Sequence, residues 1–224
     1  YFLSHLLSQD GNDITLIHAS NHHLLNVIND IAYDSGSTFK ISTIFTFNYK
    51  SSTSPIRVFN WFLFMFGLLV YCLFNFINRP KVIIYSSPSL IPYLAAWIIS
   101  RLIGAKLILD VRDLWPSSFI DVIKVKKYHP LILIHRLIEK FAYNTGDVLV
   151  SCLPGFSDLL SADKKMKSFY IPTCHFNLTK FDNNIYTSEH VMDHNDFNVV
   201  YVGGMGPAHD LGVLLEAALL LRDR

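Results

Sequence analysis

The segments Lys81-Val-Ile-Ile-Tyr-Ser-Ser-Pro88 and Leu109-Asp-Val-Arg-Asp-Leu-Trp-Pro116 decide the fold class. Each begins as an apolar run typical of a buried strand and ends in polar or aromatic residues, and a long apolar helical stretch separates them. Two strands joined by a helix must run parallel. Parallel sheets place their binding crevice at the carboxyl ends of the strands. The residues at these two ends are therefore predicted to line a crevice.

Strands and helices are predicted to alternate along the rest of the chain. The predicted strands are 13–18, 39–47, 82–85, 106–111, 147–151, 168–171 and 198–202. The predicted helices are 1–8, 59–77, 89–103, 130–143, 155–161 and 209–221. This order indicates an α/β protein with a doubly wound, parallel, Rossmann-like sheet. We expect one domain over 1–172, a polar linker over 173–197, and the first βα unit of a second Rossmann-like domain over 198–224.

Composition narrows the functional classes. The chain of 224 residues has a formal net charge of only +1, which argues against a nucleic-acid partner because such proteins present a basic face. Charged residues make up 17% of the chain, below the usual ~25%, and the 17 Phe and 11 Tyr add to an apolar surface. Three widely spaced cysteines and scattered histidines show no metal-ligand spacing, so we expect no metal site, no disulfide framework and a reducing cytoplasm.

The segment Phe59–Ile77 carries no charge over about the length that spans a bilayer. Asn60 and Asn75 lie inside its ends, and Arg57 and Arg79 flank it. A spanning helix would place the strands on either side of it across the membrane from each other. We therefore favour a helix packed on the sheet, with an outer aromatic stripe in the membrane interface. A true membrane span and a wholly buried helix are the alternatives.

Polar and aromatic residues at the two strand ends are the first candidates for a site. Arg112 and Asp113 could bind a phosphate or orient a sugar hydroxyl, with the carboxylate as a base, although a local ion pair would explain them equally well. Trp115 could be a stacking platform for a sugar, a membrane anchor or a core residue. Ser86 and Ser87 could contact substrate, or Ser87 could simply cap the helix that follows.

A glycine-rich turn follows the predicted strand 198–202. Gly203, Gly204 and Gly206 would let a phosphate approach the backbone at a helix N-terminus, although the full GxGxxG spacing is absent and a simple tight turn is the alternative. In the helix 130–143, Glu139 is expected to form a solvated pair with Arg136. The sequence contains no P-loop and no GxSxG elbow.

Taken together, several of these strings resemble family 4 glycosyltransferases of the GT-B fold. They are Val82–Pro88, Leu109–Pro116, Asp147–Ser151, Ile171–Pro172 and Val200–Gly206. The nearest subgroup is that of bacterial O-antigen, capsule and colanic-acid assembly. The resemblance implies an acceptor domain and a nucleotide-sugar domain facing each other across a cleft, with retention of configuration and no metal. It also implies acceptors linked to polyprenyl diphosphate at the inner face of the cytoplasmic membrane, which suits a peripheral role for Phe59–Ile77.

The resemblance assigns roles by position. Asp113 and Arg112 fall among the acceptor-side polar residues and are our candidate catalytic pair. The loop facing the donor diphosphate would contain Gly203, Gly204 and Gly206. Further residues would line the cleft and contact substrate, namely Ser86, Ser87, Trp115, Ser151 and Gly155.

The sequence also departs from the family pattern. The family's first strand would precede Tyr1, and its donor-site basic pair and Glu-x7-Glu motif would follow Arg224. The family's Ile-Pro-Asn-Gly string reads Ile171-Pro-Thr-Cys174. We therefore expect a fragment of a glycosyltransferase, truncated at both ends and inactive alone. The alternative is a non-catalytic, membrane-associated acceptor-binding module that needs a second chain to supply the donor domain.

Overall fold

The arrangement of the chain comes from a computed structural model. The model describes residues 2–20, 39–49, 54–75, 79–87, 89–117, 120, 126–172, 198–203 and 210–221. The predicted linker 173–197 lies outside these residues, as do Pro88, Gly204 and Gly206.

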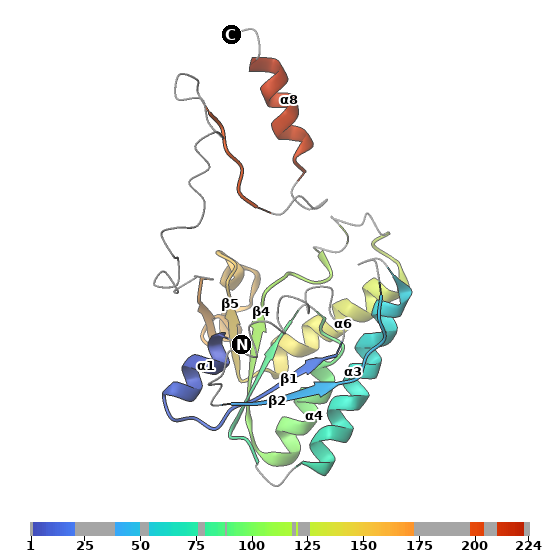
Figure 1. The fold of residues 1–224 in the computed structure, drawn as a ribbon, viewed down its shortest axis with the longest axis vertical. Coiled ribbons are helices and arrows are strands. Elements are labelled where there is room, and N and C mark those ends of the chain that lie inside the picture. Colours follow the sequence, from blue (N-terminus) through green and yellow to red (C-terminus); the bar gives the residue numbers. More distant parts are fainter. Residues whose placement is uncertain are drawn as a thin grey trace, which may run out of the picture.

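All strand pairs in the described residues are parallel (Figure 1). One sheet has the order β3-β4-β5-β6, formed by Val82–Ser86, Lys106–Val111, Val148–Ser151 and Ser168–Tyr170. A separate pair is formed by β1 (Thr15–Ala19) and β2 (Lys40–Ile44). The predicted α/β class with a parallel, Rossmann-like arrangement is confirmed. The strands divide into two sheets, however, because no ladder between β1 and β3 joins them in the described part of the chain.

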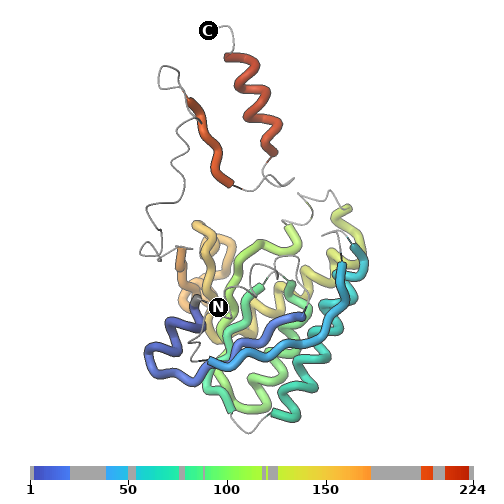
Figure 2. The backbone as a smooth tube through the Cα atoms, viewed as in Figure 1, coloured from blue at the N-terminus to red at the C-terminus, as the bar shows by residue number. Residues whose placement is uncertain are grey.

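One helical layer covers both sheets. It contains α3 (Pro55–Phe74), α4 (Tyr93–Ile103) and α6 (Pro130–Thr145), and Figure 2 shows α3 running beside α4. Alternate residues of the sheet, including Leu107, Leu109 and Leu149, pack under this layer and are fully buried. Burying such side chains stabilises the fold by about 1.5–3 kcal/mol each.

Helix α3 begins four residues earlier than predicted and ends three residues earlier. Its start has a local cause, because the Ser54 hydroxyl accepts a hydrogen bond from the Ile56 amide and Pro55 occupies the first turn. The helix lies against β2 at Gly67, where an added Cβ would overlap Cγ2 of Ile44. Such a close approach fixes α3 to the sheet along one side.

The predicted ends of the other elements are mostly close to those observed. Gly104 has a φ of 73° and closes α4 with its N–H on the Ser100 carbonyl, as predicted. The strand predicted at 198–202 is absent, since those residues have no regular structure. The helix predicted after them is present as α8 (Gly212–Leu221) and has no buried residue. The remaining elements are α1 (Phe2–Gln9), the 3-10 turn η1 (Phe156–Leu159) and α7 (Ala162–Lys165).

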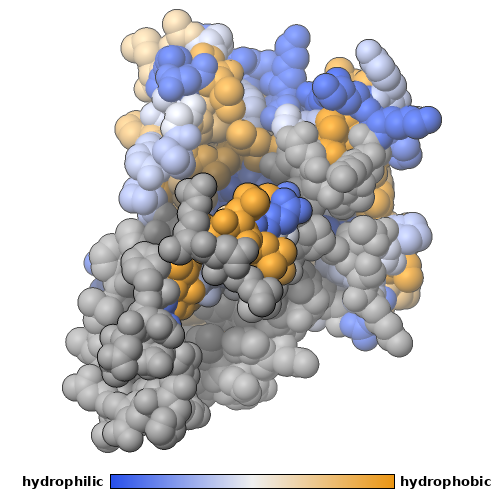
Figure 3. All heavy atoms as spheres, turned by 90° about the horizontal axis from the view of Figure 1, so that it is seen from above, coloured by the Kyte–Doolittle hydropathy of each residue, from blue (hydrophilic) through white to orange (hydrophobic). Residues whose placement is uncertain are grey.

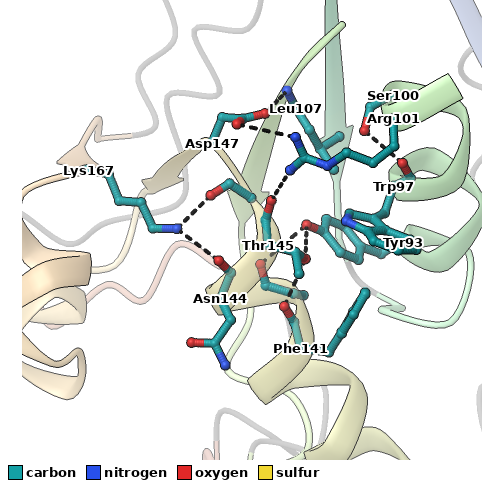
Figure 4. A network of polar contacts seen from close by, with 12 residues as sticks. Tyr93, Trp97, Ser100, Arg101, Leu107, Phe141, Asn144, Thr145, Asp147 and Lys167 are labelled. Atoms are coloured by element: carbon teal, nitrogen blue, oxygen red, sulfur yellow. Dashed lines mark hydrogen bonds and ion pairs between the residues drawn. The ribbon is translucent and has the colours of Figure 1, made fainter. Parts of the chain in front are cut away.

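A polar network fastens the amino end of β5 to the helices (Figure 4). Asp147 accepts a hydrogen bond from the Leu107 amide at 2.8 Å and lies 3.6 Å from Arg101. Arg101 also donates to the Thr145 carbonyl at 2.7 Å, and Lys167 donates to the Gly146 carbonyl at 2.6 Å. The last carbonyls of α6 thereby gain partners that a helix end otherwise lacks. This network lies at the end of the sheet opposite the predicted crevice.

Candidate functional site at the carboxyl edge of the sheet

The carboxyl ends of β3 and β4 are joined through polar side chains. The Ser86 hydroxyl donates to Oδ2 of Asp110 at 2.7 Å. The Arg112 amide donates to the buried Ser87 hydroxyl at 3.1 Å. Ser87 is therefore not the helix cap that we predicted, because α4 begins only at Tyr93 and lacks a side-chain cap. Its hydroxyl instead holds the backbone of Arg112 in place.

The end of β5 is attached to the same edge. The Ser151 hydroxyl donates to the Val111 carbonyl at 2.8 Å and accepts from the Leu153 amide at 3.1 Å. This side chain is completely buried, so it supports the strand ends and offers no exposed group to a substrate. Gly155 is exposed and adopts a left-handed φ of 76° at the start of η1, a conformation that favours glycine.

Arg112 and Asp113 are both exposed and directly follow β4. The Asp113 carbonyl accepts a hydrogen bond from the Trp115 amide at 3.0 Å, which turns the chain back toward the core. Two consecutive exposed residues, one with a guanidinium and one with a carboxylate, thus follow β4 at the predicted edge. Such a pair can bind a phosphate group and orient a hydroxyl.

Trp115 is a core residue and provides no open face for stacking. Only 7% of its surface is exposed, and its ring meets those of Trp61 and His135 at centroid distances of 5.7 and 5.8 Å. The Arg57 guanidinium lies 5.6 Å from the Trp61 ring centre and 5.7 Å from that of Trp115, within cation–π range. This cluster connects the end of β4 to the first turns of α3.

His135 belongs to the same cluster and was not singled out by the sequence pattern. It is 1% exposed, and its Nδ1 contacts the Leu131 carbonyl at 2.8 Å, but Nε2 has no hydrogen-bond partner among the described residues. Burial lowers the pKa of this imidazole, since the charged form is poorly solvated there, and the Leu131 carbonyl opposes the shift only in part. One histidine within a helical run gives no sequence signal for such a position.

Glu139 is partly buried, and is therefore less solvated than the predicted exposed pair with Arg136 requires. Burial raises the pKa of its carboxyl group, while a hydrogen bond with Tyr143 and the charge of Arg136 lower it. The expected attraction to Arg136 is therefore present, but desolvation dominates.

An exposed apolar stripe runs along α3. Its members recur at helical spacing and are Ile56, Phe59, Phe62, Phe66, Val70 and Leu73, followed by Phe74. Phe66 is 58% exposed and Phe74 81% exposed. By length and composition α3 is the one helix, in the part of the chain that the structure describes, that could cross a membrane, and only 11% of that segment is buried. Its opposite side packs on β2 and α4.

The stretch of sequence that contains this stripe carries charge of one sign. No Asp or Glu occurs between Asp34 and Asp110, whereas seven Lys or Arg residues do. This acid-free stretch, residues 35–109, includes β2, α3, β3 and α4. Counting acidic residues along the sequence would have revealed it, although the net charge of +1 for the whole chain conceals it.

The predicted donor loop is only partly described. Gly203 lies in an exposed irregular segment, and Gly204 and Gly206 lie outside the described residues. Its role in binding a diphosphate stays a prediction. Seen from above, the described residues on the upper face mix hydrophobic and hydrophilic groups (Figure 3). Among the residues that the structure describes, no group of three His, Cys, Asp or Glu could hold a metal ion.

Comparison with models of known protein families found no match, and comparison with curated proteins found no significant match.

Proposed function

We propose that this chain is the acceptor-side part of a glycosyltransferase that works at a membrane surface. The enzyme would move a sugar from a nucleotide-sugar donor to a lipid-linked acceptor in bacterial surface-polysaccharide synthesis. The observation that carries this proposal is the position of Arg112 and Asp113, exposed at the carboxyl edge and linked through Trp115 and Arg57 to the apolar helix α3.

The chemistry of this edge supports the proposal. In parallel α/β folds, ligands bind at the carboxyl ends of the strands. There, the Asp113 carboxylate would orient or deprotonate the acceptor hydroxyl, and the Arg112 guanidinium would bind an acceptor phosphate. The hydrogen bond from the Arg112 amide to Ser87 fixes the backbone that carries both side chains. Leaving-group charge on the donor would be stabilised from the Gly203–Gly206 loop.

The test is the substitution Asp113→Asn in the full-length protein. We expect turnover with a lipid-linked acceptor to fall by about 10²–10⁴-fold, because the amide can neither accept a proton nor carry charge. Binding of the nucleotide-sugar, measured by titration calorimetry, should change by less than about twofold, since Asp113 lies on the acceptor side. Asp163→Asn is the matched control, because Asp163 is an exposed carboxylate on α7.

Two results would reject the assignment. Equal loss of binding and turnover would remove Asp113 from the acceptor side. An absence of transfer by the wild-type protein with every nucleotide-sugar in a panel, together with retained binding of the lipid-linked acceptor, would favour a non-catalytic acceptor-binding module instead.

A further inference from the structure

An open groove lies where β2 leaves the sheet and α3 begins. Residues 45–48 form one wall, and Pro55, Ile56 and Phe59 form the other. Its volume is about 680 Å³, within the range of small-molecule sites. Among the residues that the structure describes, the lining is predominantly apolar and includes no charged side chain.

Aromatic rings build the walls of this groove. The Phe45 and Phe47 rings meet edge to face at 5.2 Å, and the Phe47 and Phe59 rings lie 6.0 Å apart. Phe45 is 63% exposed and Phe59 56% exposed, so the groove opens to its surroundings. Asn60 fixes the first wall, because its side-chain amide accepts from the Phe47 amide and donates to the Phe47 carbonyl.

The groove continues into the apolar stripe of α3. Phe59 belongs to both features, and from there the stripe follows the helix for about 20 Å more at 1.5 Å per residue. An apolar helical surface of this kind lies in the boundary between lipid headgroups and acyl chains. A chain leaving that boundary would enter the groove without crossing water.

The charge of the sequence stretch that contains the groove and the stripe favours an anionic lipid. The acid-free stretch supplies cations near both ends of the stripe, with Arg57 in the first turn and the exposed Arg79 and Lys81 beyond the last. Anionic lipid headgroups attract such cationic residues. Carboxylates would repel the headgroups, and this stretch of sequence contains none.

We infer that the groove holds one hydrocarbon chain of an anionic membrane lipid while α3 lies in the interface of the bilayer. This inference deepens the proposed function, because it assigns the seat of the lipid part of the acceptor to the first turns of α3. The headgroup of a lipid held there would lie near Arg57, which the Trp115 ring connects to the end of β4.

Photolabelling tests the inference. The full-length protein is mixed with phosphatidylcholine vesicles that contain phosphatidylglycerol bearing a diazirine on its acyl chain, irradiated and digested. We expect labelled peptides to concentrate in 45–48 and 55–59. Ile56→Trp, which fills the groove from an exposed position, should lower this labelling about tenfold while vesicle binding changes by less than about twofold.

Two further variants make the test specific. Val70→Trp adds the same side chain to the stripe, outside the groove, and should leave labelling of the groove unchanged. Phe59→Ala removes a side chain from one wall and should also lower labelling. This variant provides an independent test if Ile56→Trp fails to fold. Uniform labelling along α3, or groove labelling that neither Ile56→Trp nor Phe59→Ala reduces, would overturn the inference.

The inference and the proposed function can fail separately. Labelling requires no sugar donor, so a labelled groove in a protein without transferase activity would leave the lipid site standing and remove the glycosyltransferase. Measurable sugar transfer with no labelling of the groove would leave the glycosyltransferase standing and remove the lipid site.

Discussion

Asn60 offers the sharpest test of how α3 is fixed to the sheet. Its side chain is 6% exposed and makes two hydrogen bonds to the backbone of Phe47, at 2.9 and 2.7 Å. Asn60→Ala removes both and leaves an amide and a carbonyl of Phe47 without these partners. A hydrogen bond contributes a net 1 kcal/mol or so, and because Phe47 is half exposed its backbone regains some water. We therefore expect the free energy of unfolding to fall by about 2 kcal/mol.

Urea denaturation followed by circular dichroism measures this change, and the slope of the transition should stay constant because the folded surface is unchanged. Asn75→Ala is the matched control, since Asn75 is exposed at the other end of the same helix and donates one hydrogen bond to the Tyr71 carbonyl. The control should cost less than about 0.5 kcal/mol. If the two variants lose the same amount, the side chain of Asn60 does not hold Phe47, and the wall of the groove is not fixed as described.

Two other substitutions probe the packing of the helical layer. Gly67→Ala should destabilise the protein by about 1–3 kcal/mol because the new Cβ overlaps Ile44, whereas helix propensity alone would predict a gain of about 1 kcal/mol, so a higher melting temperature would contradict the close contact. The pKa of His135 lies below its ordinary value of 6.5. As the pH falls below 6.5, the unfolded chain therefore binds a proton at His135 before the folded protein does. Stability should therefore be complete above about pH 6.5 and fall progressively below it; a pH profile that His135→Phe leaves unaltered in this range would show that another group is responsible.

The sequence predicted the α/β class and the parallel strands because β3, β4 and β5 are largely apolar runs between clear breaks, but it did not predict the division into two sheets. The run at 106–111 coincides with β4, and Gly104 ends α4 where a left-handed residue is required. Residues 198–202 have the same apolar composition, yet they form no strand in the described structure. A strand needs a neighbour, and composition alone cannot supply one.

Single polar and aromatic residues were harder to place from sequence. Ser87 precedes a predicted helix and satisfies the rule for a cap. The helix begins later, however, and the Ser87 hydroxyl accepts a hydrogen bond from the amide of Arg112, the residue after β4. From sequence, Trp115 could be either a stacking platform or a core residue. Only its packing against Trp61 and His135 shows that it belongs to the core. Contacts between residues distant in the sequence decide both positions, and local patterns do not contain them.

The network around Asp147 has a consequence for how this protein can change over time. Arg101 and Lys167 connect helix ends and strand starts at one end of the sheet, through hydrogen bonds to backbone carbonyls and the ion pair between Arg101 and Asp147. Substitutions at the other end, where Arg112 and Asp113 stand exposed, leave those ties intact. New specificities can therefore arise at the open end without loss of the scaffold that carries them.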